Sequence, residues 1–403
     1  MSTVGIVGAG PSGIMAALQA AERGARVILF DSNRTVGRKL AVTGNGRGNL
    51  TNAAVGVDAY HCADRSFLER ALSAFGRDDL LTYLRRVGVL TYATHDGWYY
   101  PVSGSAATVV EALATALDAA GVEVRLLTKV DDLRPRGAGW ELWAGGGSSK
   151  IPVDRVVVAT GGMAAPALGS KGSMFPVLEG LGHTVIPLRP ALVPLVGDVR
   201  HLHKLQGVRL DVRVRLLAGD EVLGEEFGNL MFTQSGLSGP APMNLSYLVG
   251  SDGRKGLEAS IDLVPTHRHE LMQLLHEQQG RPVPLRVLLG SVVPPKVPPV
   301  IMELAGVPRE ARLTEVDGEA LARVLGHLRD LRVRVTGTRG FDQAQLSAGG
   351  VPVTEVDADT MESRKARGLH LAGEVMDVVG PCGGFNLQFA FTSGALAGRA
   401  AAG

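Results

Sequence analysis

Residues 3–31 read TVGIVGAGPSGIMAALQAAERGARVILFD, and this stretch decides the fold. Its pattern predicts a short apolar strand over Thr3–Val7, a helix that ends near Gly24, and a second strand over Arg26–Phe30. The turn between the first strand and the helix, residues 8–13, has the spacing GxGxxG, and Asp31 stands at the end of the second strand. Together these features predict a β-α-β unit and therefore a Rossmann-like α/β fold.

The glycine turn predicts a binding site for a dinucleotide. Gly8 permits the tight turn, Gly10 lets the backbone approach a pyrophosphate, and Gly13 allows the helix to pack closely on the strand. The N-terminus of the helix faces the phosphate charge, and Asp31 is placed to accept hydrogen bonds from an adenosine ribose. The alternative is a glycine turn in an ordinary β-α-β unit, which the surrounding strand, helix and acid disfavour.

Length and composition bound the class of protein. A chain of 403 residues is too long for one compact core, so two or three domains are expected. Lys and Arg total 41 against 40 Asp and Glu, which excludes a global basic field that would recruit nucleic acid or a membrane. The two cysteines, Cys62 and Cys382, exclude a disulfide scaffold and a Cys-rich metal site. The histidine pairs 201/203 and 267/269 have no carboxylate or cysteine at zinc-site spacing, so no metal is predicted.

The chain shows no signal for membrane insertion or export. No apolar run approaches the roughly 18 residues that a membrane span needs. The first ten residues have no basic region before the apolar stretch and no small-residue cleavage site. A cytoplasmic location is therefore expected.

The character of the sequence changes near residues 187–194. Residues 208–216 alternate strictly between apolar and charged side chains, and residues 331–335 repeat the pattern, which is typical of half-exposed antiparallel strands. Between them, short helices are expected over 266–278, 284–292, 300–305 and 318–328. The predicted domains are a Rossmann-like domain over 1–189 with 341–403, an antiparallel β domain over 190–265 with 329–340, and a helical insertion over 266–328.

The Rossmann-like domain has further predicted elements. Helices are expected near 64–75 and 78–87 and over 105–121, and strands near 123–128, 139–144 and 153–159. At the C-terminal end, a strand is expected over 368–372, followed by a helix over 385–401.

Three more loops have ligand-binding character. The loop 32–52 holds four basic residues, no acid and alternating glycines, so it offers cations and N–H donors to a dinucleotide; the alternative is a solvated loop. Residues 160–162 end a buried strand, where doubly wound sheets bind ligands, although a plain turn explains them equally well. Gly373 ends the last strand, and residues 383–384 open the final helix, whose dipole favours a flavin ring or its phosphates.

Read together, five segments resemble a known family. They are GAGPSGIMAA, GRKLAVTGNGRGNLTN, FTQSGLSGPA, SAGGVPVTEVDADTMES and GLHLAGEVMDVVGPCGGFNLQFAFTSG. In order and spacing they are similar to the flavoproteins of the bile-acid-reductase and aminoacetone-oxidase-like family of NAD(P)/FAD-dependent oxidoreductases, which includes a ribosomal RNA dihydrouridine synthase type. The resemblance implies an FAD-binding domain of the GR2-type two-dinucleotide fold, built from both chain ends, with an inserted barrel-like β domain and a small helical domain.

The resemblance also assigns FAD-contacting positions, residue by residue. They are Gly8, Gly10, Pro11, Ser12, Gly13, Asp31, Ser32, Lys39, Gly44, Asn45, Gly46, Arg47, Val130, Thr160, Gly161, Gly162, Gly373, Glu374, Gly384, Phe385 and Asn386.

No catalytic residue is assigned with the cofactor site. The family loop commonly reads GNGRCN, and this chain has Gly48 where that cysteine would be. A thiol close to a flavin can donate a proton, so Cys382, beside Gly383, is the remaining candidate. An unreactive structural thiol is the alternative interpretation of Cys382.

The function that the resemblance implies is hydride transfer through flavin N5 to a conjugated C=C bond, with NADH or NADPH as the reductant. A uridine of ribosomal RNA is the preferred substrate, because the family is widespread, although residues 191–340 hold 18 basic and 17 acidic residues and RNA grooves are usually basic. The alternatives are a small-molecule flavin enzyme, either an enone reductase or an aminoketone oxidase, and a non-enzymatic RNA or ribosome-assembly factor that keeps FAD structurally.

Overall fold

The computed structural model describes residues 1–250, 253 and 255–403, and the chain divides into two compact units. Unit 1 contains Met1–Arg189 and Gln345–Gly403, and unit 2 contains Pro190–Ala344. Each unit has a hydrophobic core of its own. The finer division into three domains with separate roles stays a prediction.

A five-stranded parallel sheet forms the centre of unit 1, in the order β20-β11-β1-β2-β7. Its strands are β1 (Thr3–Val7), β2 (Arg26–Phe30), β7 (Glu123–Arg125), β11 (Arg155–Val158) and β20 (Leu369–Leu371). The predicted β-α-β unit is confirmed at the centre of this sheet. Because β20 comes from the C-terminal segment and pairs with β11, both chain ends build one sheet, as the Rossmann-like expectation required.

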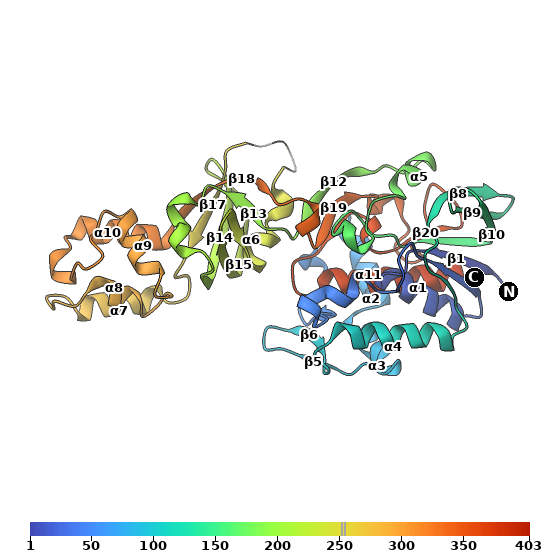
Figure 1. Ribbon diagram of the computed structural model, residues 1–403, viewed down its shortest axis with the longest axis horizontal. Coiled ribbons are helices and arrows are strands. Elements are labelled where there is room, and N and C mark those ends of the chain that lie inside the picture. The colour runs from blue at the N-terminus through green and yellow to red at the C-terminus, as the bar shows by residue number, and fades with distance from the viewer. Residues whose placement is uncertain (251–252, 254) are drawn as a thin grey trace. The chain divides into compact units, whose positions relative to one another are not determined.

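Helices cover the sheet, and the first and last of them pack together. Helix α1 (Pro11–Glu22) and helix α11 (Phe385–Ala401) lie side by side in Figure 1, blue against red. They approach at the level of the backbone, since a Cβ at Gly394 would stand 2.2 Å from the Ser12 carbonyl oxygen. The other helices of unit 1 are α2 (Arg65–Ala74), α3 (Arg77–Arg86), α4 (Ala106–Ala119) and α5 (Phe175–Gly180).

Two predicted strands of unit 1 need correction. The strand expected over 123–128 ends at Arg125. Leu127 has a φ of 52°, a left-handed conformation that is incompatible with an extended strand. The strand expected over 153–159 is two strands, because Val153 pairs with Trp140 in a separate antiparallel sheet while β11 begins at Arg155. Asp154 follows β10 (Ser149–Val153) and is bonded to Thr3: its N–H donates to the Thr3 carbonyl at 2.8 Å, and its carboxylate accepts the Thr3 N–H at 2.7 Å.

Smaller sheets lie outside the central sheet and the barrel. They are β10-β9-β8 (Ser149–Val153, Gly139–Ala144, Val130–Arg136), β3-β6-β5 (Thr51–Asn52, Trp98–Pro101, Thr91–Ala93), β21-β4 (Val378–Val379, His61–Cys62) and β12-β19 (Ile186–Ala191, Leu346–Gly350).

Unit 2 contains a closed antiparallel barrel, in the order β13-β16-β15-β14-β17-β18. The strands are β13 (Leu195–Gly197), β14 (Arg209–Ala218), β15 (Glu221–Thr233), β16 (Gly236–Ser238), β17 (Leu257–Asp262) and β18 (Leu331–Thr338). The alternation predicted over 208–216 is confirmed, since Val212, Val214 and Leu216 are fully buried while Arg209 and Arg215 are exposed. The inserted antiparallel β structure of the expected fold class is therefore present.

Helices occupy the chain between β17 and β18, where they were expected. They are α7 (Arg268–Glu277), α8 (Leu285–Leu289), α9 (Val297–Leu304) and α10 (Gly318–Arg329), and a short α6 (Pro240–Asn244) precedes them. Of the helices in the described part of the chain, none is both long and apolar enough to cross a membrane.

Candidate functional site

The glycine turn has the geometry that its spacing predicts. Gly8 has a φ of 104°, and its N–H donates to the Phe30 carbonyl at 2.8 Å. A Cβ at Gly13 would stand 1.8 Å from the Gly8 carbonyl oxygen, so only glycine allows this approach of helix to strand. A Cβ at Gly10 would meet nothing within 4 Å. The backbone at the start of α1 therefore borders open space, with the N–H groups of Ser12 and Gly13 in the first helical turn.

Asp31 has a role in the chain itself that the sequence analysis missed. One carboxylate oxygen accepts the Ala9 N–H at 2.7 Å, and the other accepts from the backbone N–H of Asn33 at 2.7 Å and from its side-chain amide at 2.9 Å. The acid expected to meet only a ribose thus also ties the glycine turn to the loop after β2. Within the described part of the chain, Oδ2 accepts only the Ala9 N–H and keeps a lone pair, so the ribose contact stays a prediction.

Two of the predicted FAD positions, Val130 and Ser32, differ in their exposure to solvent. Val130 begins β8 and is 3% exposed, so its predicted contact with FAD stays a prediction. Ser32 is exposed directly after Asp31.

The loop 32–52 bends through a run of left-handed residues. Gly44, Asn45 and Gly46 have φ values of 57°, 56° and 83°, inside the 3₁₀ segment Leu40–Gly46. A Cβ at Gly46 would meet nothing within 4 Å, so the backbone here also faces open space. Behind the turn, Asn49 is buried and its Oδ1 has no hydrogen-bond partner. A buried acceptor without a donor is costly in a folded chain and is typical of a site that a ligand completes.

An ion pair joins two of the predicted segments across the length of the chain. The Lys39 ammonium lies 2.7 Å from Glu374 Oε2, and both side chains are largely buried. Glu374 Oε1 accepts the Ser347 N–H at 2.9 Å. Gly162 fits beside them only because it lacks a side chain, since its Cβ would stand 2.6 Å from Ser347 Oγ and 2.8 Å from Glu374 Oε1.

Ser347 was missed by the sequence analysis. Its Oγ accepts the N–H groups of Met163 at 2.8 Å and Ala164 at 3.0 Å, and so fixes the chain directly after Gly162. The motif SAGG, which contains Ser347, was the available signal.

The loop before α11 is held by side chains from two directions. Asn386 accepts the Gly380 N–H and donates to the Gly380 carbonyl, both at 2.8 Å. Asn52 donates to the Gly383 carbonyl at 2.9 Å. Gly384 has a φ of 97°, and its Cβ would stand 2.6 Å from the Thr51 carbonyl oxygen. Thr51 and Asn52, which the sequence analysis did not single out, therefore position the start of the last helix.

The remaining predicted positions lie at strand and helix ends. Thr160 and Gly161 follow β11, and Gly161 has a φ of 73°. Gly373 follows β20 with a φ of 78°, and a Cβ there would stand 2.6 Å from Ser12 Oγ. The Phe385 side chain is buried at the first position of α11.

These features fit an FAD. Its pyrophosphate, ribose and ring would face four features of the chain. They are the open backbone at Gly10 and Gly46, the acid at the end of β2, the buried unpaired acceptor of Asn49, and the helix start at Gly384, which has no acid in its first turn. Which residue contacts which cofactor atom stays a prediction.

The backbone at residue 48 favours glycine over the cysteine that the family commonly has there. Gly48 has a φ of 81°, and a Cβ there would stand 3.1 Å from the Ala106 Cα, so this chain is shaped for glycine. Cys382 is half-buried in the loop before α11. Burial raises the pKa of the Cys62 thiol to about 11, which makes it a poor proton donor.

A buried hydrogen-bond chain has the order of a hydrolase triad. Ser363 Oγ lies 2.7 Å from His183 Nε2, and His183 Nδ1 lies 2.9 Å from Glu355 Oε2. The same Oγ accepts the N–H groups of Lys365 and Ala366, and Ser363 and His183 are buried. An oxygen that already accepts two N–H groups and has no open surface is a turn-stabilising group, not a nucleophile.

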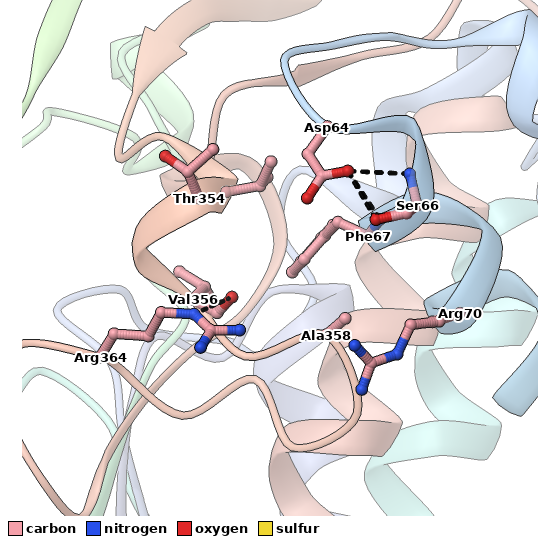
Figure 2. A pocket seen from close by; sticks show the side chains of 9 residues that line it. Asp64, Ser66, Phe67, Arg70, Thr354, Val356, Ala358 and Arg364 are labelled. Carbon is pink, nitrogen blue, oxygen red and sulfur yellow. Dashed lines mark hydrogen bonds between the residues drawn. The ribbon is translucent and has the colours of Figure 1, made fainter.

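Figure 2 shows a pocket of about 240 Å³ elsewhere in unit 1, between the start of α2 and residues 353–364. None of the predicted site residues lines it. Its two cations are occupied, since Arg70 pairs with Asp359 and Arg364 pairs with Asp357. Neither this pocket nor any other part of residues 1–250, 253 and 255–403 holds a cluster of three potential metal ligands.

The chain is similar to known proteins over nearly its whole length. A family model described as the HI0933-like protein Rossmann domain matches residues 2–400. The chain is 35% identical to the 3-dehydro-bile acid delta(4,6)-reductase of Clostridium scindens over 409 residues, covering 100% of this chain and 99% of that protein. It is 32% identical to the ribosomal RNA dihydrouridine synthase of Escherichia coli over 398 residues, covering 96% and 95% of the two chains.

Among solved structures, the chain resembles the 3-ketosteroid delta1-dehydrogenase of Sterolibacterium denitrificans, with a TM-score of 0.52, 13% identity and 100% coverage of both chains. That likeness shows the fold. Fold, glycine-built site and relatives define a flavoprotein oxidoreductase with a Rossmann FAD-binding domain. The chain belongs to the HI0933-like family, and the resemblance stated from the sequence is confirmed.

Proposed function

We propose that this flavoprotein reduces a conjugated C=C bond of a small-molecule enone, with NADH or NADPH as the reductant. FAD, when bound, would supply hydride transfer from the nicotinamide to one carbon of the C=C bond, and a proton would complete the other carbon. The chain's own residues hold the cofactor, exclude water and place the enone.

Three arginines of the unit 2 barrel bear on the choice between a small molecule and RNA. Arg213 and Arg215 both pair with Glu225, and their guanidiniums hold the pKa of Glu225 below its usual range. Arg332 pairs with Asp330 and Glu258. Side chains already neutralised by acids release few counterions from a phosphate backbone, so these three arginines are poorly suited to RNA.

The relatives support the same choice. The bile acid reductase matches at 35% identity over the whole chain and the RNA enzyme at 32%. The expectation of a ribosomal RNA uridine as the preferred substrate therefore gives way to the small-molecule alternative, in its reductase form.

The test starts with the FAD-loaded protein under anaerobic conditions. We expect NADH or NADPH to bleach the flavin, and 3-oxo-4-cholenoic acid to restore its colour with a product heavier by two hydrogens. An unmodified ribosomal RNA transcript, added in place of the steroid, is expected to leave the flavin reduced.

Two results would contradict the proposal. One is dihydrouridine in the transcript together with an inert steroid, which would assign an RNA substrate. The other is rapid reoxidation by oxygen with an aminoketone consumed, which would assign an oxidase.

A further inference from the structure

The β5–β6 hairpin carries three aromatic rings on one face. Tyr92 and Tyr100 are directly paired across the strands, and Trp98 lies two residues from Tyr100, so all three point to the same side. The Tyr92 and Tyr100 ring centroids are 6.2 Å apart with planes at 33°, and those of Trp98 and Tyr100 are 6.5 Å apart at 31°. We call these three rings the aromatic face.

The aromatic face is open to solvent at Tyr92 and partly at Trp98, whereas Tyr100 is 2% exposed and lies beneath Arg47; the open part continues into apolar surface. Tyr92 is 45% exposed, and Leu90 and Val102 are 54% and 61% exposed. The Val102 N–H donates to the Leu90 carbonyl at 2.8 Å, so the two-residue period of the strands places this pair on the same side of the hairpin. A contiguous exposed apolar patch of this kind marks a binding surface more often than a solvated one.

A cation without an acid lies on this face. The Arg47 guanidinium carbon stands 4.6 Å from the centre of the Tyr100 ring, and its Nη2 donates to Tyr100 Oη at 3.2 Å. Within the described residues Arg47 forms no ion pair, and it is exposed. Burial raises the pKa of Tyr100, so the phenol stays neutral and leaves the charge of Arg47 uncompensated.

The aromatic face touches both loops that are predicted to hold the flavin. A Cβ at Gly44 would stand 3.2 Å from Tyr100 Cε1, and a Cβ at Gly383 would stand 3.2 Å from Trp98 Cε2. The rings thus lie directly against the left-handed turn of residues 44–46 and the loop before α11.

We propose that the exposed part of the aromatic face, Tyr92 and the half-buried Trp98, binds the ring system of the substrate and that Arg47 takes an anionic group on the same molecule. The inference rests on the proposed function and names the surface that selects its substrate. Exposed aromatic rings suit an extended apolar ring system, and a planar guanidinium held on a ring is preorganised for a carboxylate. Leu90 and Val102 add aliphatic contact that a polar nucleobase would not use, and a single unpaired arginine is little charge for RNA.

The experiment is calorimetric titration of the oxidised, FAD-loaded protein, which needs no turnover. The probes are 3-oxo-4-cholenoic acid, its neutral methyl ester, and UMP as the nucleotide counterpart. We expect the acid to bind about tenfold more tightly than the ester, and Arg47→Gln, reconstituted with FAD to the flavin content of the wild type, to remove that difference. Tyr92→Ala is expected to weaken the acid and the ester equally, by about five- to tenfold.

Phe227→Ala is the matched control, because Phe227 is an aromatic residue of unit 2 that is 55% exposed. Its expected affinities equal those of the wild type. Loss of FAD in Arg47→Gln with the preference for the acid intact would assign the guanidinium to the cofactor and overturn the inference. Binding of UMP that depends on Arg47 and Tyr92, with no binding of either steroid, would assign the surface to RNA.

Failure of the inference and failure of the proposed function are distinguishable. If the wild type binds and reduces the steroid but Arg47→Gln and Tyr92→Ala bind it unchanged, only the inference is wrong. If the wild type neither binds nor reduces any enone probe, the proposed function is wrong as well.

Discussion

Gly384 shows how single left-handed residues build the cofactor site. It precedes α11 with a φ of 97°, and the Thr51 carbonyl oxygen occupies the place that a Cβ would need. A side chain here meets two penalties: a strained backbone, at roughly 1–2 kcal/mol, and a collision with a main-chain atom that cannot move alone.

Gly384→Ala is therefore expected to lose bound FAD and to lower the melting temperature. Gly182→Ala is the matched control, because Gly182 has a similar φ of 92° and a Cβ there meets nothing within 4 Å. The measurement is the ratio of flavin to protein absorbance after purification, together with thermal unfolding. Equal loss of FAD in both variants would mean that strain alone, and not the contact with Thr51, explains the glycine.

A second single residue, the buried His370, predicts that the stability of the protein depends on pH. It is 2% exposed in β20, its Nδ1 lies 2.9 Å from the Thr360 carbonyl, and burial lowers its pKa below the usual 6.5. Below about pH 6.5 the unfolded chain binds a proton that the folded chain refuses, so the free energy of unfolding falls as the pH falls until the folded pKa is passed. Above about pH 6.5 this stabilisation is fully present.

We expect His370→Asn, which keeps a donor for Thr360, to show a shallower loss of stability between about pH 6.5 and 5 than the wild type. Urea midpoints at a series of pH values give the slope. Parallel curves for the two proteins would show that other groups carry the acid sensitivity.

At the scale of elements, the contact of α1 with α11 joins the two ends of the chain. A Cβ at Gly394 or Gly398 would stand 2.2 Å from a carbonyl oxygen of α1, that of Ser12 or of Ala16. These glycines, four residues apart, put the backbone of the last helix on that of the first. Because the first turn of α1 borders the predicted pyrophosphate site, this packing also sets where that turn lies.

Gly398→Ala is expected to destabilise unit 1 by more than about 2 kcal/mol, since the added methyl group must displace backbone. Gly326→Ala serves as the comparison, because Gly326 lies in α10 and a Cβ there meets no atom within 4 Å. Alanine at this position is expected to raise the free energy of unfolding by about 0.5–1 kcal/mol. Denaturant unfolding of both variants measures the difference. A Gly398→Ala protein as stable as the wild type would contradict the close packing of the two helices.

At the scale of the whole molecule, the two units differ in how the chain makes them. Unit 2 is one continuous segment, Pro190–Ala344, with a closed barrel and its own core, whereas unit 1 needs both chain ends. All the predicted FAD positions lie in unit 1. A ligand that binds one folded unit stabilises that unit by mass action.

We expect the segment 190–344, produced alone, to unfold cooperatively at a temperature that FAD does not change. In the full chain, FAD at 100 times its dissociation constant is expected to raise the free energy of unfolding of unit 1 by about 2.7 kcal/mol. Removal of FAD is therefore expected to lower the melting temperature of unit 1. Differential scanning calorimetry with and without FAD separates the two transitions. A segment 190–344 that fails to fold would show that its core depends on unit 1.

The sequence alone determined the β-α-β unit, the glycine turn, the alternating strands of unit 2 and the family. Each of these depends on neighbours in the chain, because apolar periodicity and left-handed glycines are local requirements. Tertiary structure alone decided that Asp31 binds Ala9 and that Lys39 meets Glu374, 335 residues away. It also decided that Glu225 neutralises two arginines and that Arg47 lies on Tyr100 without an acid. Such partners are set by how distant segments close on one another, and a linear pattern does not contain that information.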